Sequence, residues 1–220
     1  MPHGKTARVR AGRLTLLCAL LAALVSGCAT ISSQPPTSDA ITVAPPRLFY
    51  EKIDISGRLG LRYDLNGNPQ SLDGKFTWTQ TTGLTHITLL TPFGQTLATI
   101  DVTPQTSTLM QAGQPPRSAA SVDELTATAL GWPLPIAGLR DWLQGFATGA
   151  GNTPYVASAR ASVDAAYIKT ADGWLIHYPV WEAGNAGDIG ARPRRIDLQR
   201  TTTEAGKVSL RIILDQWQPH

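Results

Sequence analysis

Cysteine is scarce in this chain, with Cys18 and Cys28 as the only two among 220 residues. Both lie near the amino terminus, so no thiol follows position 28. This distribution excludes a disulfide framework in the main part of the chain, and it excludes cysteine-based metal sites and cysteine nucleophiles there. A domain formed by the later residues must be stabilised by its hydrophobic core alone.

Charge is also sparse, at 16% of the residues, and the common catalytic motifs are missing. The sequence contains no Gly-rich phosphate-binding loop and no Gly-x-Ser-x-Gly nucleophile elbow. His86 and His177 lie in strand-like segments without the spacing of metal ligands. We therefore expect no enzyme activity, no cofactor and no metal site.

The first 27 residues have the parts of a cleaved export signal. Four basic residues come first, and residues 14–25 then carry no charge. An apolar run of about twelve residues is too short to span a bilayer. Residues 24–28, Leu-Val-Ser-Gly-Cys, resemble the bacterial lipoprotein box. That resemblance implies cleavage after residue 27 and acylation of Cys28; the alternative is an ordinary secretory signal with a chance cysteine.

Removal of this signal changes the charge of the protein. Residues 1–27 hold four of the nineteen Lys and Arg residues and none of the sixteen Asp and Glu residues. The mature chain therefore has fifteen basic and sixteen acidic residues, a formal charge of −1 in place of +3. The basic character belongs to the signal, so composition gives no reason to expect nucleic-acid binding.

Residues 28–47 are predicted to form a tether behind the lipidated cysteine. This segment is rich in Ser, Thr, Pro and Ala, with Pro-Pro pairs at 35–36 and 45–46. It cannot bury enough apolar surface to offset the entropy lost on ordering. As a flexible coil, about twenty residues span roughly 25 Å. Residues 48–220 are long enough for one domain with a sizeable core.

Alternating apolar and polar residues predict that this domain consists mainly of strands. From Ile53 to Leu65 the odd positions are mostly apolar and the even positions mostly polar, which indicates a strand with one buried face. Residues 66–69 supply a turn, and the next strand carries Phe76 and Trp78 on one face. Further strands are predicted at 84–90, 95–102, 167–169, 174–178, 196–200 and 208–214. Their short connections favour a strongly curved antiparallel sheet, an incomplete barrel.

Two helices are predicted between the strands. Residues 121–124, Ser-Val-Asp-Glu, form a capping box, and Gly131 with Pro133 ends this helix. Pro135 suits the first turn of a second helix. The apolar stripe of that helix consists of Ile136, Leu139, Trp142 and Leu143. Both helices are expected to cover the concave face of the sheet, giving a mainly β protein of the α+β class.

Seven short motifs occur in order along this domain. They are residues 56–59 (SGRL), 76–80 (FTWTQ), 89–94 (LLTPFG), 131–135 (GWPLP), 139–145 (LRDWLQG), 173–178 (GWLIHY) and 210–217 (LRIILDQW). Any one of them would be weak, but their order and spacing behind a lipoprotein box are specific. The chain resembles the LolB family of outer-membrane lipoprotein receptors over nearly the whole domain.

The resemblance implies an unclosed antiparallel β-barrel whose helices cover a hydrophobic cavity. It also implies a receptor that accepts acylated lipoproteins from the periplasmic carrier LolA and inserts them into the outer membrane. Its partners would be LolA, the lipoprotein cargo and outer-membrane lipid, and we expect a monomer. The alternative is a structural or scaffolding envelope lipoprotein that binds a protein partner and encloses no lipid.

The resemblance also places the protein in the cell. Ala29 follows the lipidated cysteine at the position where Asp commonly signals retention in the inner membrane. We therefore expect an outer-membrane protein that faces the periplasm and is anchored through Cys28.

Pro92, Phe93 and Gly94 are predicted to form a membrane insertion loop. Pro and Gly mark a turn between two strands. In the family, a large apolar residue between this Pro and Gly projects into solvent, and membrane insertion depends on it. Leu is the familiar residue there, whereas this chain has the bulkier Phe93. From the residues alone, the alternative is that Phe93 folds back into the core.

Trp78, Ile136, Leu139 and Trp142 are assigned to the wall of the acyl-chain cavity. Packing in an ordinary core is the alternative for these side chains, because aromatic residues at strand or helix spacing are most often core. Residues 192–195, Arg-Pro-Arg-Arg, are the only basic cluster and are interpreted as a solvated loop before a strand. The alternative for this cluster is a contact with anionic head groups or an acidic carrier surface.

Overall fold

A computed structural model describes residues 47–158, 167–183 and 190–220 of the protein. The predicted signal sequence, Cys28, the tether up to position 46 and most of the loop at 184–190 lie outside the described residues. The elements in chain order are β1 (Ile53–Leu65), β2 (Asn68–Gln80), β3 (Thr85–Leu90), β4 (Thr96–Val102), β5 (Ser107–Gln111), β6 (Arg117–Ala119), α2 (Val122–Leu130), α3 (Ile136–Trp142), β7 (Phe146–Gly149), β8 (Thr153–Val156), β9 (Ile168–Lys169), β10 (Leu175–Glu182), β11 (Arg192–Thr202) and β12 (Gly206–Pro219).

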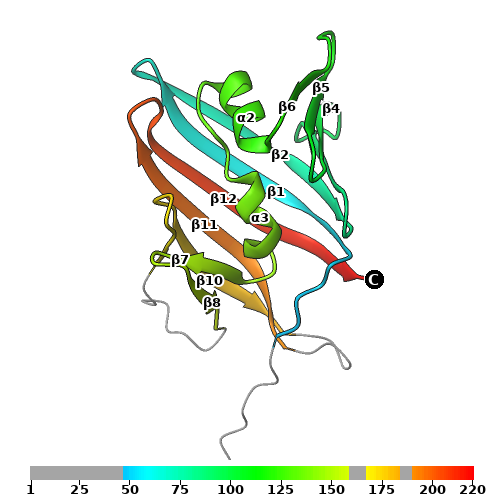
Figure 1. The fold of residues 1–220 in the computed structure, drawn as a ribbon, viewed down its shortest axis with the longest axis vertical. Helices are drawn as coiled ribbons and strands as arrows, with labels where there is room; N and C mark the ends of the chain where they lie inside the picture. Colours follow the sequence, from blue (N-terminus) through cyan, green and yellow to red (C-terminus); the bar gives the residue numbers. More distant parts are fainter. Residues whose placement is uncertain (1–46, 159–166, 184–189) are drawn as a thin grey trace, which may run out of the picture. The chain divides into compact units, whose positions relative to one another are not determined.

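Ten of the strands form one antiparallel sheet in the order β6-β5-β4-β3-β2-β1-β12-β11-β10-β9. Strand β1 pairs with β2 on one side and with the last strand, β12, on the other. Strands β6 and β9 are the two edges, so the sheet stays open within the described residues. Figure 1 shows α2 and α3 lying across the strands of this sheet. The predicted mainly β fold with an unclosed antiparallel sheet is confirmed.

The sheet bends where glycines allow backbones to approach closely. The register of β1 against β12 shifts between Ser56 and Gly57, and such a bulge bends a strand and increases its twist. A Cβ atom on Gly57 would collide with the carbonyl oxygen of Ile213, and one on Gly74 would collide with that of Leu90. These two positions therefore need glycine for the curvature of the sheet.

The two predicted helices are present, although the second, predicted to end at Gly145, ends at Trp142. The hydroxyl of Ser121 accepts a hydrogen bond from the Glu124 backbone N–H at 3.2 Å, as expected for a capping box. Helix α2 ends at Gly131, whose φ of 85° lies in the left-handed region. Helix α3 is a short second helix after Pro135. Neither helix has the length and apolar composition to cross a membrane, as judged on the described part of the chain.

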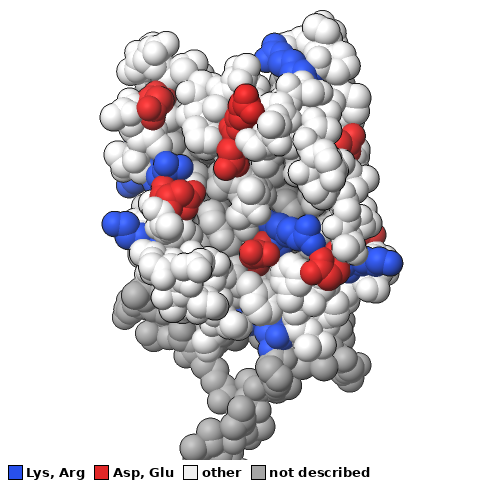
Figure 2. Space-filling view, viewed as in Figure 1, with Lys and Arg blue, Asp and Glu red and all other residues white. Residues whose placement is uncertain are grey.

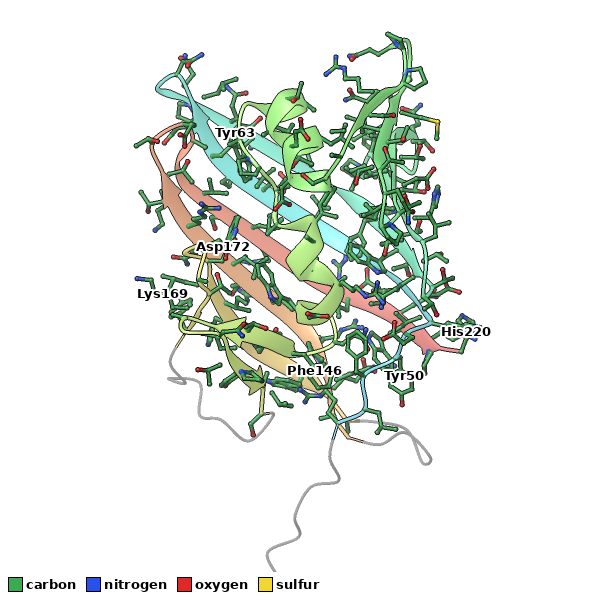
Figure 3. The ribbon with its side chains drawn as sticks, in the orientation of Figure 1. Tyr50, Tyr63, Phe146, Lys169, Asp172 and His220 are labelled. Carbon is green, nitrogen blue, oxygen red and sulfur yellow. The ribbon has the colours of Figure 1, made fainter. Side chains whose placement is uncertain are left out.

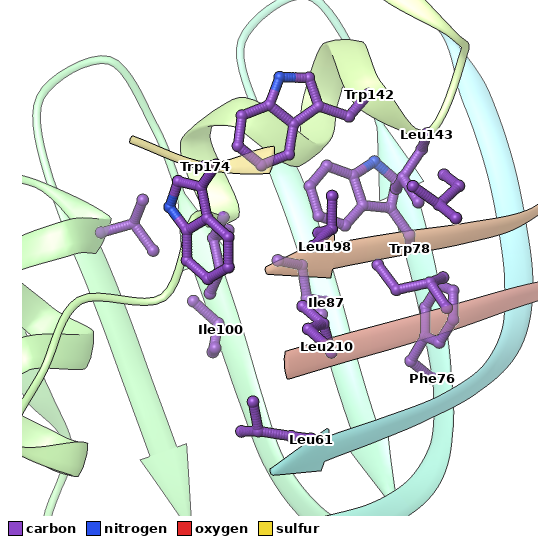
Figure 4. Close-up of a cluster of buried hydrophobic side chains, with 14 of the residues drawn as sticks. Leu61, Phe76, Trp78, Ile87, Ile100, Trp142, Leu143, Trp174, Leu198 and Leu210 are labelled. Carbon is purple, nitrogen blue, oxygen red and sulfur yellow. The ribbon is translucent and has the colours of Figure 1, made fainter. Parts of the chain in front are cut away.

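The core lies between the concave face of the sheet and the helices. Inward side chains form rows across neighbouring strands because cross-strand partners share a face. One row runs through Leu72, Leu61, Leu210 and Leu198, and another through Trp78, Ile87, Ile100 and Leu109. Figure 4 shows several of these side chains together with the indole rings of Trp142 and Trp174.

Several elements were not predicted. Strands β5 and β6 continue the sheet beyond β4, and β7 pairs with β8 in a separate two-stranded sheet. The interpretation of residues 192–195 as a loop is wrong, since Arg192 already begins β11. The acidic partners of these arginines lie in β10, β11 and β12. Strand pairing brings these side chains together, so the composition of residues 192–195 alone did not indicate a strand.

Candidate functional site

An apolar cavity of about 80 Å³ lies between the sheet and the helices. Every lining residue is Leu, Ile, Phe or Trp. They are Leu59, Leu61, Leu72, Phe76, Trp78, Ile87, Leu89, Ile100, Leu134, Ile136, Leu139, Leu143, Leu210 and Ile212. With no hydrogen-bonding group in its wall apart from the Trp78 indole N–H, the cavity suits a hydrocarbon ligand.

The predicted cavity residues fall into two groups. Trp78, Ile136 and Leu139 line the cavity, from β2 and from α3. Trp142 is not one of the lining residues; its ring packs 6.4 Å from the ring of Trp174, centroid to centroid. The indole N–H of Trp78 donates to the Gln80 side chain at 3.2 Å, which leaves the ring faces for the cavity.

Helix α3 is held over the cavity by a few polar contacts at its carboxyl end. The Tyr178 hydroxyl donates to the backbone carbonyl of Trp142 at 3.0 Å. The buried side chain of Gln144 accepts from the Tyr50 N–H at 2.8 Å and donates to the Tyr50 carbonyl at 3.0 Å. Arg140 forms an ion pair with Glu51. The contacts of Gln144 and Arg140 join the helix end to the chain segment that precedes β1, and the contact of Tyr178 joins it to β10.

A second, partly polar groove adjoins the apolar cavity. It has a volume of about 240 Å³ and is lined by the β2–β3 turn, the β4–β5 turn and one face of α3. Trp78 and Ile136 belong to the walls of both spaces. Thr82, Thr85 and Arg140 add polar groups to this groove. A partly polar groove therefore adjoins the apolar cavity on the side of the β2–β3 and β4–β5 turns.

The Pro92–Phe93–Gly94 segment forms the tight turn between β3 and β4. The Thr91 carbonyl accepts from the Gly94 N–H at 2.9 Å, and the Thr91 N–H donates to the Gln95 carbonyl at 2.8 Å. Gly94 has a φ of 92°, which favours glycine. The Phe93 side chain is 94% exposed. A large aromatic ring thus projects from a rigid turn, away from the core.

A third pocket lies on the other side of α3 and contains three aspartates. Asp123 and Asp141 line it together with Asp172. Burial raises the pKa of Asp141, and Glu51 adds to this effect while Arg140 opposes it. Burial also raises the pKa of Asp123, with Asp172 adding to the effect and Arg200 opposing it. The carboxylates of Asp123 and Asp141 therefore destabilise the folded protein when they are ionised.

The arginines of residues 192–195 are paired and therefore are not a free basic patch. Arg192 forms an ion pair with Glu182, Arg195 with Asp197, and Arg194 lies near both Glu182 and Asp215. On the face that carries the helices, acidic and basic side chains are scattered without a block of one sign (Figure 2). The arrangement gives no support to a strongly basic contact surface.

The histidines and acidic side chains of the described residues do not form a metal-binding cluster. No group of three or more His, Cys, Asp and Glu side chains there is placed to hold a metal ion. His86 contacts Asp101 at 2.5 Å and Thr88 at 3.3 Å. Because its strand neighbours Thr85 and Ile87 are buried, His86 lies on the face of the sheet opposite to the cavity.

Comparison with known proteins gives a consistent result. The family model "Outer membrane lipoprotein LolB" matches residues 51–217. An outer-membrane lipoprotein LolB of Cupriavidus taiwanensis is 35% identical over 96% of this chain and 99% of its own length. The corresponding proteins of Thiobacillus denitrificans and Nitrosococcus oceani are 34% and 31% identical, over 94% and 89% of this chain and 97% and 92% of their own lengths.

Comparison with solved structures gave a similar chain of low sequence identity. A LolA superfamily protein from Nitrosomonas europaea has a TM-score of 0.41 and 9% sequence identity, covering 79% of this chain and 88% of its own.

Proposed function

The chain belongs to the LolB family of outer-membrane lipoproteins, and from this premise we propose that it accepts acylated lipoproteins from the periplasmic carrier LolA and inserts them into the outer membrane. Lipoprotein localisation, without catalysis, is the role associated with this family. In the proposal, Cys28 carries the lipid anchor, residues 28–47 are the tether and the domain faces the periplasm. Cargo lipoproteins and outer-membrane lipid are the further partners.

The observation that carries the proposal is the apolar wall of the cavity. Exposing an acyl chain of about sixteen carbons to water costs on the order of 12 kcal/mol, at ~0.8 kcal/mol per methylene. A protein that passes such a chain between two membranes must cover it throughout. The side chains of Trp78, Ile136 and Leu139 offer a surface of this kind.

The cavity in this conformation is too small for its proposed ligand. An apolar cavity of roughly 150 Å³ holds one benzene molecule, whereas this one has about 80 Å³. We therefore propose that α3 moves away from the sheet when an acyl chain enters. The few polar contacts at the end of α3 are compatible with such a movement, because each contributes only about 1 kcal/mol.

In the proposal, the Phe93 turn touches the bilayer during insertion. Burial of a Phe side chain contributes roughly 1.5–3 kcal/mol. This is too little to anchor a protein, but it is enough to favour one orientation of a tethered domain at a membrane. Pro92 and Gly94 hold the ring on a tight turn, so that it meets the bilayer before the rest of the domain.

The test is a transfer assay with an acylated lipoprotein loaded on LolA. A soluble form without the lipid anchor should take the lipoprotein from the carrier. We expect Phe93→Glu to accept cargo normally but to lose about tenfold or more of its insertion into liposomes, measured by co-sedimentation of cargo with the vesicles. Its stability should stay within about 0.5 kcal/mol, because the ring is exposed.

Phe93→Leu is the matched control, because it keeps an apolar side chain on the turn. It should insert cargo nearly as well as the unmodified protein. Equal insertion by the Glu and Leu variants would contradict the role of the turn. Failure of the unmodified protein to take cargo from LolA would contradict the receptor function and favour a scaffolding lipoprotein.

A further inference from the structure

The groove beside the apolar cavity combines an apolar wall with unused hydrogen-bond donors. Its floor is the same pair of side chains, Trp78 and Ile136, that borders the cavity. Its rim is formed by the β2–β3 turn, where Thr82 is exposed, and by Thr85 at the start of β3. A ligand that leaves the cavity on this side passes directly into the groove.

Thr82 and Thr85 have hydroxyls that form no hydrogen bond with the described residues. The neighbouring Thr81 and Thr103 differ, because their hydroxyls donate to the backbone carbonyls of Leu84 and Thr106 and so close the two turns. Thr85 is nevertheless 6% exposed. The fully buried unpaired side-chain atoms of the described residues do not include the Thr85 hydroxyl, so this hydroxyl is open to the groove, where a ligand can reach it.

Arg140 supplies the third donor group of the groove. Its guanidinium forms an ion pair with Glu51, which holds it at the edge of α3. A guanidinium carries five N–H donors, so the ion pair leaves some of them available to a ligand. The groove therefore presents donors to a ligand, and Glu51, its nearest carboxylate, is already paired.

We propose that this groove binds the ester and amide carbonyls that join acyl chains to the amino-terminal cysteine of a lipoprotein. The inference rests on the proposed function, since it assumes that the chains themselves occupy the apolar cavity. Carbonyl oxygens are neutral acceptors, and they lose hydrogen bonds to water when the chains become buried. Thr82, Thr85 and Arg140 replace those bonds next to the cavity wall.

The groove thereby distinguishes an acylated cysteine from a plain hydrocarbon. The apolar cavity alone recognises any chain of suitable width, because its wall has almost no polar group to reject a wrong ligand. The donors in the adjoining groove add a requirement for carbonyls at the head of the chains. The groove is thus a specificity site for the lipoprotein modification.

The experiment compares two synthetic lipopeptides, a dipalmitoyl-glyceryl-cysteine peptide with ester bonds and its counterpart with ether bonds. Both have the same chain length, but the ether form lacks the ester carbonyls. The soluble protein should bind the ester form about three- to tenfold more tightly, as expected for one or two hydrogen bonds. Thr85→Val should reduce this preference, because Thr82 and Arg140 remain, and should leave the affinity for the ether form unchanged.

Thr99→Val is the matched control, since Thr99 lies on the opposite face of β4 between the buried Ala98 and Ile100. It should keep the ester preference. An unchanged preference in Thr85→Val, or no preference in the unmodified protein, would overturn the groove proposal while the cavity proposal stands. Failure of the protein to bind either lipopeptide would contradict the acyl-binding function itself.

Discussion

Tyr178 shows how a single hydroxyl fixes the helix that covers the cavity. It donates to the Trp142 carbonyl at 3.0 Å, at the end of α3. Burial raises the pKa of Tyr178 far above its ordinary value, so the hydroxyl remains a neutral donor at every physiological pH. The bond therefore does not depend on pH.

Tyr178→Phe should lower the free energy of unfolding by about 1 kcal/mol, because the Trp142 carbonyl loses its donor. The melting temperature, followed by circular dichroism, should fall by about 2–4 °C for a domain of this size. In the proposed function α3 moves to admit an acyl chain, so the variant should also take up a fluorescent fatty acid faster. Tyr155→Phe is the control, because Tyr155 is 37% exposed. An equal loss of stability in both variants would contradict the assignment.

At the residue scale, sequence reasoning succeeded where a side chain sits in a recognisable motif. The position of Phe93 between Pro and Gly indicated a turn, and Trp78 and Leu139 were placed at the cavity by family resemblance. Thr85 gave no signal, because a threonine in a strand looks the same whether its hydroxyl faces a groove or solvent. The packing of Trp142 against Trp174 depends on how β10 reaches α3, which no local pattern shows.

At the element scale, α3 carries an ionisable group that weakens it. Asp141 is half-buried, and its pKa is raised mainly by burial. A raised carboxyl pKa means that the folded state binds the proton more tightly than the unfolded state does. Stability contributed by the protonated form is therefore lost as pH rises above the ordinary Asp value of about 4.

Asp141→Asn should therefore stabilise the protein at pH 7 and leave its stability unchanged near pH 3. Urea unfolding at the two pH values measures this difference. Asp123→Asn should act in the same direction, since the pKa of Asp123 is also raised by burial. Glu182→Gln should have the opposite sign at pH 7, because the hydrogen bond from Arg192 lowers the pKa of Glu182. Destabilisation at pH 7 by the Asp141 variant would refute the argument.

Long strands and capped helices could be predicted from the sequence, whereas short strands and strands without a buried face could not. The alternation from Ile53 to Leu65 gave β1 with the right bounds, and the capping box at Ser121 gave the start of α2. Strand β6 has only three residues, and the four residues of β8 are all exposed. Neither segment therefore shows an alternation of apolar and polar residues. Tertiary pairing alone makes these segments strands.

At the scale of the whole molecule, the architecture is an open antiparallel sheet. The strand count and turns indicated an antiparallel sheet, but the pairing of β1 with β12 and the open edges at β6 and β9 come from long-range register. No local sequence pattern indicates which strands form the two edges of the sheet. The family resemblance implied only that the sheet is unclosed.

The chain enters the domain at the end of the strands opposite to Phe93. Arg47 donates to the carbonyls of Gly145, Ala157 and Ala191, and it stacks 4.4 Å from the Trp181 ring centroid. Tyr50 and Phe146 lie at this same end (Figure 3). It is the end at which β1 begins and β12 finishes, whereas the Phe93 turn follows the far end of β3.

In the proposed arrangement, with a lipid anchor on Cys28 and the Phe93 turn on the bilayer, these positions set a minimum length for the tether between membrane and domain. Residues Thr85 and Leu90 lie roughly 17 Å apart along β3, at about 3.4 Å per residue, and the Phe93 turn projects further. If the strands point at the membrane and Phe93 touches the bilayer, Arg47 lies more than roughly 17 Å from the bilayer surface. The chain from Cys28 to Arg47 can reach about 65 Å when fully extended, which is ample.

Deletion of residues 30–43 would leave a reach of only about 17 Å. We expect this variant to accept cargo from LolA normally, because the cavity and α3 are untouched. Its insertion of cargo into the liposomes that hold its own lipid anchor should fall to the level of Phe93→Glu, since the turn and the anchor cannot reach the bilayer together. A Gly/Ser segment of the original length should restore insertion, which separates length from sequence. Full insertion by the shortened chain would mean that the domain meets the membrane by a surface near Arg47 and not by the Phe93 turn.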